Sequence, residues 1–375
     1  MTAMPAPRPL VRLAKRAMPL RIPARWGALC ASMFGLLFLV ANAVGDVSPS
    51  LGLPQAIDVS LPGERNLQTE LGRQLFHDPL LSNDGTMSCA VCHVPEQAFT
   101  VNDIATATGR GGILLPRNAP SLLNVSLAKS LLREGRARSL EEQIWGPLLS
   151  PDELANSSAE QVVARLQGRP EYDRAFKNAF AGREITRELI GAALAAYERS
   201  LVAAGSPFDQ WYLGNDQSAM SAEAKAGFEV FRSSGCNRCH SVERNDATFS
   251  DDSYRNTGVE WARINGQLGQ TKVIPDLGRF TVTARDEHRY AFRVPTLRNV
   301  ALTSPYMHDG SLSTLRDVID FYDGGSGNDP ARDKILHRLD LSELQKTQLI
   351  AFLESLTSDY AAVLAKRASA PLVKR

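Results

Sequence analysis

Two short motifs, Cys89-Ala-Val-Cys92-His93 and Cys236-Asn-Arg-Cys239-His240, constrain this chain of 375 residues more than any other feature. Each motif provides two thiols that can bond the vinyl groups of a haem, and a histidine directly after them that can ligate the iron. The sequence has 5 cysteines, and the remaining one is Cys30. Two such motifs in a chain with so few cysteines predict two covalently bound haem c groups.

Structural zinc sites and disulfide frameworks also use paired cysteines. A zinc site needs four ligands that converge within one small module, whereas these two pairs lie far apart in the sequence. A disulfide framework does not require a histidine immediately after each pair. Haem attachment therefore explains the pattern better than either alternative.

The N-terminal segment predicts export from the cytoplasm. Six basic residues precede an uncharged apolar stretch that runs from Trp26 to Val44 and ends in the small residues Ala41-Asn-Ala43. This order is typical of a signal peptide, here residues 1–43, which would take Cys30 with it on cleavage. The alternative is an uncleaved membrane anchor, since a spanning helix needs roughly 20 apolar residues. Either arrangement places the folded part in the periplasm, and only a retained segment would attach it to a membrane.

Apolar spacing and capping residues predict a mainly α-helical fold made of two tandem cytochrome c-like haem domains. After the signal segment, roughly 330 residues remain, which is enough for two domains. The formal net charge is +1 with no basic stripe, so no nucleic acid partner is expected. No strand pattern is evident. Helices are expected over residues 64–77, 140–145 (ended by Gly146-Pro147), 158–167, 171–180, 186–202, 221–231, 314–322 and 342–356.

A cluster of helix-breaking residues at Gly205-Ser206-Pro207 marks the predicted boundary between the domains. It separates an N-terminal haem domain, residues 60–205, from a C-terminal haem domain, residues 206–365. Two long polar loops, residues 106–120 and 245–278, are expected to wrap the haems, because loops of this length inside a compact domain usually have a function.

The histidines of the first domain bear on the second axial position of its haem iron. The first histidine after His93 in the sequence is His240, so no downstream histidine of the first domain can close that position. His77 lies upstream, at the end of a predicted helix that leads into the motif. An open iron is a site for chemistry, whereas a closed one mainly transfers electrons.

The second domain offers three candidate ligands for its iron: Met307, His308 and Tyr322. A methionine ligand raises the haem potential, and tyrosine is also a known haem ligand. Tyr322 shares a helical face with Leu315 and Val318, however, and most tyrosines in such a position belong to the core.

Gln143 and Glu153 are candidates for acid–base chemistry in the first domain. A buried glutamate near an open haem can take a proton from bound peroxide and return it to the leaving oxygen. Composition alone favours a simpler role for Glu153, which is to interact with the dipole of the helix that follows Ser150-Pro151.

Several segments resemble bacterial di-haem cytochrome c peroxidases, over nearly the whole mature chain. The sequence is also similar to the MauG branch of this family, which completes a tryptophan-derived quinone cofactor on a partner protein. Besides the two haem motifs, the matching segments are Leu71-Gly-Arg-Gln-Leu-Phe76, Leu81-Ser82, Arg117-Asn-Ala-Pro-Ser-Leu122, Gly135-Arg-Ala137, Leu140-Glu-Glu-Gln143, Pro147, Val294-Pro-Thr-Leu-Arg-Asn299 and Pro305-Tyr-Met-His-Asp-Gly310.

The resemblance implies roles for the residues around the first haem. The haem on His93 would be the peroxidatic one, with Gln143 and Glu153 on its distal side and Pro147 nearby. The haem on His240 would be its electron-transfer partner.

The resemblance also implies the remaining ligands. The distal ligand of the second haem falls at Tyr322, where the peroxidases typically have methionine and MauG has tyrosine; Met307 is the alternative. A Ca²⁺ between the domains would take a side-chain oxygen from Asn118 and backbone oxygens from Thr303 and Pro305, which are ligand types that suit this ion.

This sequence departs from the family pattern at two places. The peroxidases that open only after reduction keep a histidine shortly after the first motif, and its absence here predicts a site that is open without prior reduction. The family's tryptophan between the haems is replaced by Arg133, ten residues before Gln143. An arginine cannot relay an electron hole as an indole can. Trp145 is either a substitute or a core residue.

Taken together, the resemblance implies a periplasmic di-haem oxidoreductase that uses hydrogen peroxide. Peroxide would bind at the first haem, Glu153 would transfer a proton, and the O–O bond would break to leave a high-valent haem that oxidises a protein or another donor. Tyr322 favours this MauG-like function. The alternatives are a cytochrome c peroxidase that draws electrons from a small cytochrome c or cupredoxin, and a di-haem electron carrier without catalytic activity.

Overall fold

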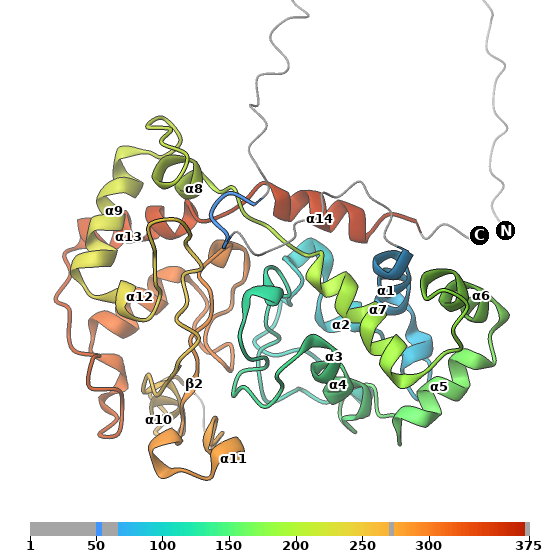
Figure 1. Ribbon diagram of the computed structural model, residues 1–375. Helices are drawn as coiled ribbons and strands as arrows, with labels where there is room; N and C mark the ends of the chain where they lie inside the picture. The colour runs from blue at the N-terminus through green and yellow to red at the C-terminus, as the bar shows by residue number, and fades with distance from the viewer. Residues whose placement is uncertain (1–49, 55–66, 270–273, 372–375) are drawn as a thin grey trace, which may run out of the picture. The chain divides into compact units, whose positions relative to one another are not determined.

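A computed structural model of the chain describes residues 50–54, 67–269 and 274–371 (Figure 1). The predicted signal peptide, residues 1–43, lies outside the described residues. Within the described residues the fold is helix-rich, as the sequence predicts. No helix in this part of the chain has the length and apolar character needed to cross a membrane.

The helices follow one another with short 3₁₀ turns and irregular segments between them. Their bounds are α1 Leu67–His77, α2 Cys89–Cys92, α3 Leu140–Gln143, α4 Trp145–Leu149, α5 Ala159–Gln167, α6 Pro170–Ala179, α7 Arg187–Arg199, α8 Pro207–Tyr212, α9 Ala222–Ser233, α10 Val259–Ile264, α11 Phe280–Thr283, α12 Leu315–Asp323, α13 Glu343–Glu354 and α14 Tyr360–Ala368.

The capped helices lie where the sequence places them. Ser158, Thr186 and Ser221 accept hydrogen bonds from backbone N–H groups in the first turns of α5, α7 and α9. Thr314 and Ser342 do the same for α12 and α13, in both cases within a capping box. These side chains satisfy N–H groups that have no partner inside the helix, so local sequence is enough to fix where each helix begins.

The predicted helix end at Gly146-Pro147 is wrong, because α4 continues through these residues to Leu149. Proline is tolerated there because it falls in the first turn of α4, where backbone N–H groups lack helical partners anyway. The structure also contains one short antiparallel pair, β1 (Tyr254–Arg255) with β2 (Phe292–Arg293), that was not predicted. Strands of two residues are too short to show alternating apolar residues.

Buried apolar side chains form two large clusters. The first is built from α1 and α4 to α7, together with the segments between them. The second is built mainly from α8, α9, α12 and α13. The last helix, α14, adds Ala361, Leu364 and Ala368 to the first cluster. The C-terminal end of the chain therefore packs with the helices that surround the first haem motif.

Each haem motif is preceded by a helix that crosses another helix at a glycine. α1 packs on α7 and α9 packs on α13 (Figure 1). A Cβ atom at Gly72 would lie 1.9 Å from the carbonyl oxygen of Ala193, and one at Gly227 would lie 1.8 Å from that of Gln348. The two pairs can approach this closely only because glycine has no side chain. Both motifs are thus placed by the same packing arrangement.

We expect Gly227→Ala to lower the free energy of unfolding by about 1–3 kcal/mol, because the added methyl group must push α9 away from α13. Gly168→Ala is the matched control, since its Cβ would lie 3.5 Å from its nearest neighbours at a negative φ of −70°. Denaturant unfolding of the haem-loaded proteins measures both changes. Equal stabilities for the two variants would contradict this account of the helix crossing.

Candidate functional site

One large cavity brings the two haem motifs together. Its volume is about 1840 Å³, and its lining includes Cys92 and His93 of the first motif and Cys236, Cys239 and His240 of the second. An ordinary ligand pocket measures roughly 300–1000 Å³. The cavity therefore has room for more than one large cofactor.

The two motifs have closely similar backbone geometry. The N–H of His93 donates to the carbonyl of Cys89 at 3.0 Å, across the single turn of α2. The N–H of His240 donates to the carbonyl of Cys236 at the same distance, across the 3₁₀ turn η5 (Cys236–Arg238). Each turn gathers two thiols and an imidazole, as covalent haem attachment requires.

Both motif histidines are oriented by a backbone carbonyl. Nδ1 of His93 lies 3.1 Å from the oxygen of Phe99, and Nδ1 of His240 lies 3.0 Å from that of Phe249. A carbonyl only accepts hydrogen bonds, so Nδ1 carries the proton and Nε2 keeps its lone pair for a metal. Burial also lowers the pKa of both imidazoles, which favours the neutral form. This donor set fits haem iron.

The predicted distal residues of the first haem converge on the same cavity. Gln143 on α3, Pro147 on α4 and Glu153 after α4 line it together with His93. Burial raises the pKa of Glu153, with Ser150 opposing the shift. Oε1 of Gln143 is buried without a hydrogen-bond partner among the described residues. A glutamate with a raised pKa and a glutamine oxygen without a partner among the described residues therefore line the same cavity as the first motif.

Around the second motif, the structure separates the three candidate ligands. Met307, His308 and Tyr322 all line the cavity, and burial raises the pKa of Tyr322 to about 12, with a hydrogen bond to Thr257 opposing the shift. Nε2 of His308 lies 2.9 Å from Oε2 of Glu260, and its ring stacks on Phe292 with 4.0 Å between the centroids. His308 is therefore engaged in a hydrogen bond, whereas Met307 and Tyr322 remain candidates.

His77 and Trp145 do not line the cavity. The ring of His77 packs edge-on against Phe76, with 5.2 Å between the centroids. Trp145 belongs to the first apolar cluster, and the guanidinium of Arg187 lies 5.1 Å from its ring centre. Trp145 thus packs in the core, as one of its two sequence interpretations expects.

A set of charged residues beside the cavity was not found from the sequence. Arg117 forms ion pairs with Glu134, which is buried, and with Asp276, at 2.6 Å between Nε and Oδ2. Arg136 also pairs with Glu134. Arg117 and Asp276 are 159 residues apart, and no motif connects them. The sequence therefore carries no signal for this network.

The residues of the implied Ca²⁺ site line the cavity, but one of them is already engaged. Asn118, Thr303 and Pro305 are all part of the lining. Nη2 of Arg133 donates to Oδ1 of Asn118 at 2.8 Å and to its backbone oxygen at 3.1 Å. Among the described residues, no group of three or more His, Cys, Asp or Glu side chains is arranged to hold a metal ion. The amide oxygen expected to bind Ca²⁺ thus binds a guanidinium.

The chain is similar to known di-haem proteins. A family model described as di-haem cytochrome c peroxidase matches residues 66–217. The methylamine utilization protein MauG of Methylorubrum extorquens is 40% identical over 78% of this chain and 79% of its own length. The cytochrome c551 peroxidase of Nitrosomonas europaea is 34% identical over 88% of this chain and 91% of its own. The crystal structure of a MauG-like protein associated with microbial copper homeostasis matches with a TM-score of 0.71 and 30% identity, over 86% of this chain and 97% of that one.

Glu198 on α7 is a buried carboxyl group, and its Oε2 has no hydrogen-bond partner in the part of the chain that the structure describes. Burial raises the pKa of Glu198 from its ordinary value of about 4.3 to about 8. Between these pH values the folded state therefore binds more protons at Glu198 than the unfolded state, and the contribution of Glu198 to stability falls as the pH rises from about 5 to about 8. The pKa difference between the two states corresponds to at most about 5 kcal/mol in the free energy of unfolding.

We expect Glu198→Gln to remove most of this pH dependence, because the amide does not ionise. Thermal midpoints of the haem-loaded protein between pH 5 and pH 8 measure the effect. Glu171→Gln, on the exposed part of α6, is the matched control and should keep the slope of the unmodified protein. Parallel curves for Glu198→Gln and the unmodified protein would show that Glu198 is already ionised at pH 5.

Proposed function

This chain belongs to the di-haem cytochrome c peroxidase family, and we propose that it is a periplasmic, MauG-like enzyme that oxidises a protein substrate. It is an oxidoreductase that depends on hydrogen peroxide and carries haem c. The observation that carries the proposal is the cavity that Gln143, Pro147 and Glu153 line together with His93, and that His77, the other histidine of the first domain, does not line. Such a site can admit peroxide directly.

The residues of the two motifs would hold the cofactors in two tandem haem domains, residues 60–205 and 206–365. The thiols bond the haem vinyl groups, and His93 and His240 offer Nε2 to the two irons. When bound, haem c supplies the redox-active iron at which peroxide is reduced. Residues 106 and 114–120 of the loop over residues 106–120 line the cavity, which supports a role of this loop in wrapping the haem.

Glu153 is the proposed proton carrier. Burial raises the pKa of Glu153, which favours a carboxyl group that holds a proton and can pass it on. With haem c bound to supply the electrons for peroxide reduction, Glu153 would accept a proton from peroxide and return it to the oxygen that leaves as water. The unpaired amide oxygen of Gln143 can accept a hydrogen bond from peroxide and so orient it.

Tyr322 is the proposed distal ligand of the second haem and supports the MauG-like function. It lines the cavity near Cys236 and Cys239. Met307 lines the same cavity and favours a second candidate, a cytochrome c peroxidase that takes electrons from a small cytochrome c or cupredoxin. We do not include a bound Ca²⁺ in the proposal, because Asn118 is engaged by Arg133.

We expect Glu153→Gln to slow the reaction with stoichiometric peroxide by about 10²–10⁴-fold, the usual contribution of a positioned acid–base group. Stopped-flow absorbance of the haem bands measures the rate. Asp152→Asn is the matched control, because this neighbouring carboxylate is exposed and does not line the cavity. If Glu153→Gln reacts with peroxide as fast as the control, the acid–base role of Glu153 is wrong. If the unmodified protein and the control do not react with peroxide either, an electron carrier becomes the better description.

We expect Tyr322→Phe to change the low-spin EPR signal of the second ferric haem and to shorten the lifetime of the oxidised state that peroxide forms without reductant. Loss of a phenolate ligand removes the group that stabilises high oxidation states at this haem. Tyr306→Phe is the control, because Tyr306 also lines the cavity but its hydroxyl donates a hydrogen bond to the carbonyl of Val300. An unchanged signal in Tyr322→Phe, with a changed one in Met307→Leu, would assign the ligand to Met307.

A further inference from the structure

Asn118 has its polar atoms fully engaged. Its N–H donates to the carbonyl of His308 at 2.8 Å, and its Nδ2 donates to the carbonyl of Ala105 at 3.1 Å. The first bond holds the backbone of Asn118 and the second holds its side-chain amide, whose Oδ1 accepts a hydrogen bond from Arg133. The only group that approaches the backbone oxygen and Oδ1 together, among the described residues, is the guanidinium of Arg133.

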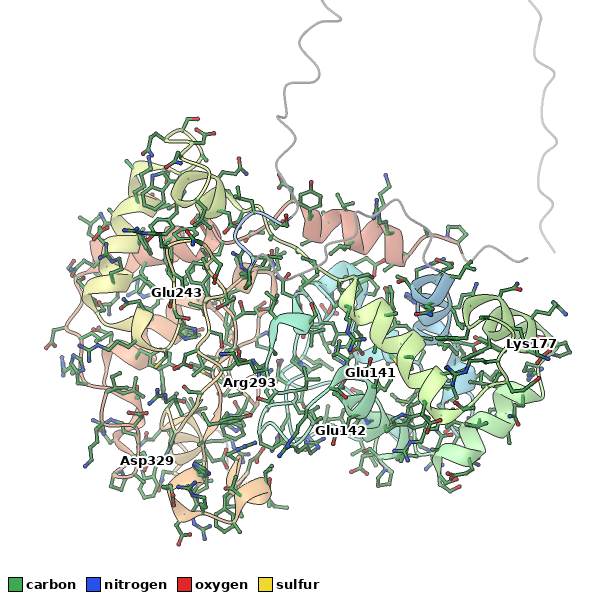
Figure 2. The ribbon with its side chains drawn as sticks, viewed as in Figure 1. Glu141, Glu142, Lys177, Glu243, Arg293 and Asp329 are labelled. Carbon is green, nitrogen blue, oxygen red and sulfur yellow. The ribbon has the colours of Figure 1, made fainter. Side chains whose placement is uncertain are left out.

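The backbone that carries Arg133 is itself held in place by residues distant in the sequence. Arg293, which is labelled in Figure 2, lies on β2. Its backbone N–H donates a hydrogen bond of 2.8 Å to the carbonyl of Arg133. Nη1 of Arg279 donates to the next two carbonyls, those of Glu134 and Gly135. The backbone from which the side chain of Arg133 reaches Asn118 is therefore held by residues distant in the sequence.

Charges of both signs surround this contact. Burial, the largest cause, and the like charges of Arg293 and Arg117 lower the pKa of Arg133 to about 10, whereas Asp309 opposes the shift. Arg133 is therefore still protonated at neutral pH. Arg117 and Arg293 are themselves paired with carboxylates. A divalent cation bound at Oδ1 of Asn118 would have to share that oxygen with the guanidinium of Arg133, whose like charge would repel it.

The geometry points to Arg133 as the fixed cation of the site that the family resemblance assigns to Ca²⁺, so that this chain binds no Ca²⁺ there. The guanidinium supplies one positive charge and two hydrogen bonds to the oxygens of Asn118, which Ca²⁺ would otherwise order. A covalently attached cation is not lost to chelators. The arrangement around the two motifs is thus independent of the calcium concentration outside the cytoplasm.

The test is a calcium measurement on the haem-loaded full chain after treatment with EGTA. We expect less than about 0.1 equivalent of Ca²⁺ in the purified protein, where a dedicated site of oxygen ligands would retain one. We also expect no change in the thermal midpoint or the haem EPR spectrum when EGTA or 1 mM CaCl₂, an excess on the order of the weakest protein sites, is added. One retained equivalent, or a midpoint that falls with EGTA, would overturn the proposal.

Three variants separate the charge of Arg133 from its bulk. Arg133→Gln removes the charge, and we expect a midpoint lowered by about 2–4 °C that CaCl₂ restores while one equivalent of Ca²⁺ binds. Arg133→Lys keeps the charge and should stay free of Ca²⁺. Arg138→Gln, exposed and outside the cavity, controls for the loss of a surface arginine. A folded Arg133→Gln variant that takes up no Ca²⁺ would also overturn the proposal, because the site at Asn118 would then not be a cation site. None of these readouts requires reaction with peroxide.

Discussion

The hydrogen bond from each motif histidine to a backbone carbonyl is the constraint on which the rest of the site depends. Phe99 and Phe249 provide these carbonyls, and each lies a few residues after its motif. Because the bond fixes which ring nitrogen carries the proton, it also fixes the direction in which His93 and His240 offer their lone pairs. The proposed roles of Gln143, Glu153 and Tyr322 depend on where these residues lie relative to that direction. The apolar clusters and the glycine crossings serve to hold these two turns in place.

The parts of the structure that the sequence predicts are those with local causes. Helices α5, α7, α9, α12 and α13 begin at side chains that cap their own first turn, so a few neighbouring residues determine each start. The two motifs are local as well, since the thiols and the imidazole lie on one turn. The residues expected on the distal side of the first haem were assigned through the family resemblance, and they line one cavity in the structure, although composition alone favoured a simpler role for Glu153.

The parts that the sequence does not predict depend on contacts between distant residues. The engagement of His308 by Glu260 and the network of Arg117, Glu134 and Asp276 join segments that no local pattern relates. The contact between Arg133 and Asn118 belongs to the same class. From the sequence, Arg133 is visible only as the loss of a tryptophan and hence of a route for electrons. In the fold, Arg133 also makes a contact of its own, because its guanidinium binds the side-chain amide of Asn118, to which the family resemblance assigns a metal ion.

The same arginines connect folding with the cofactors. Nε atoms of Arg133, Arg279 and Arg293 are buried without a hydrogen-bond partner among the described residues. Leaving a charged donor unpaired in the interior costs more than the loss of an ordinary hydrogen bond. Arg133 and Arg293 line the cavity, and haem carries carboxylate groups that can pair with guanidinium groups. Arg133 and Arg293 can therefore pair with the carboxylates of bound haem, and the charge of Arg133 that opposes Ca²⁺ at Asn118 is the same charge that favours haem.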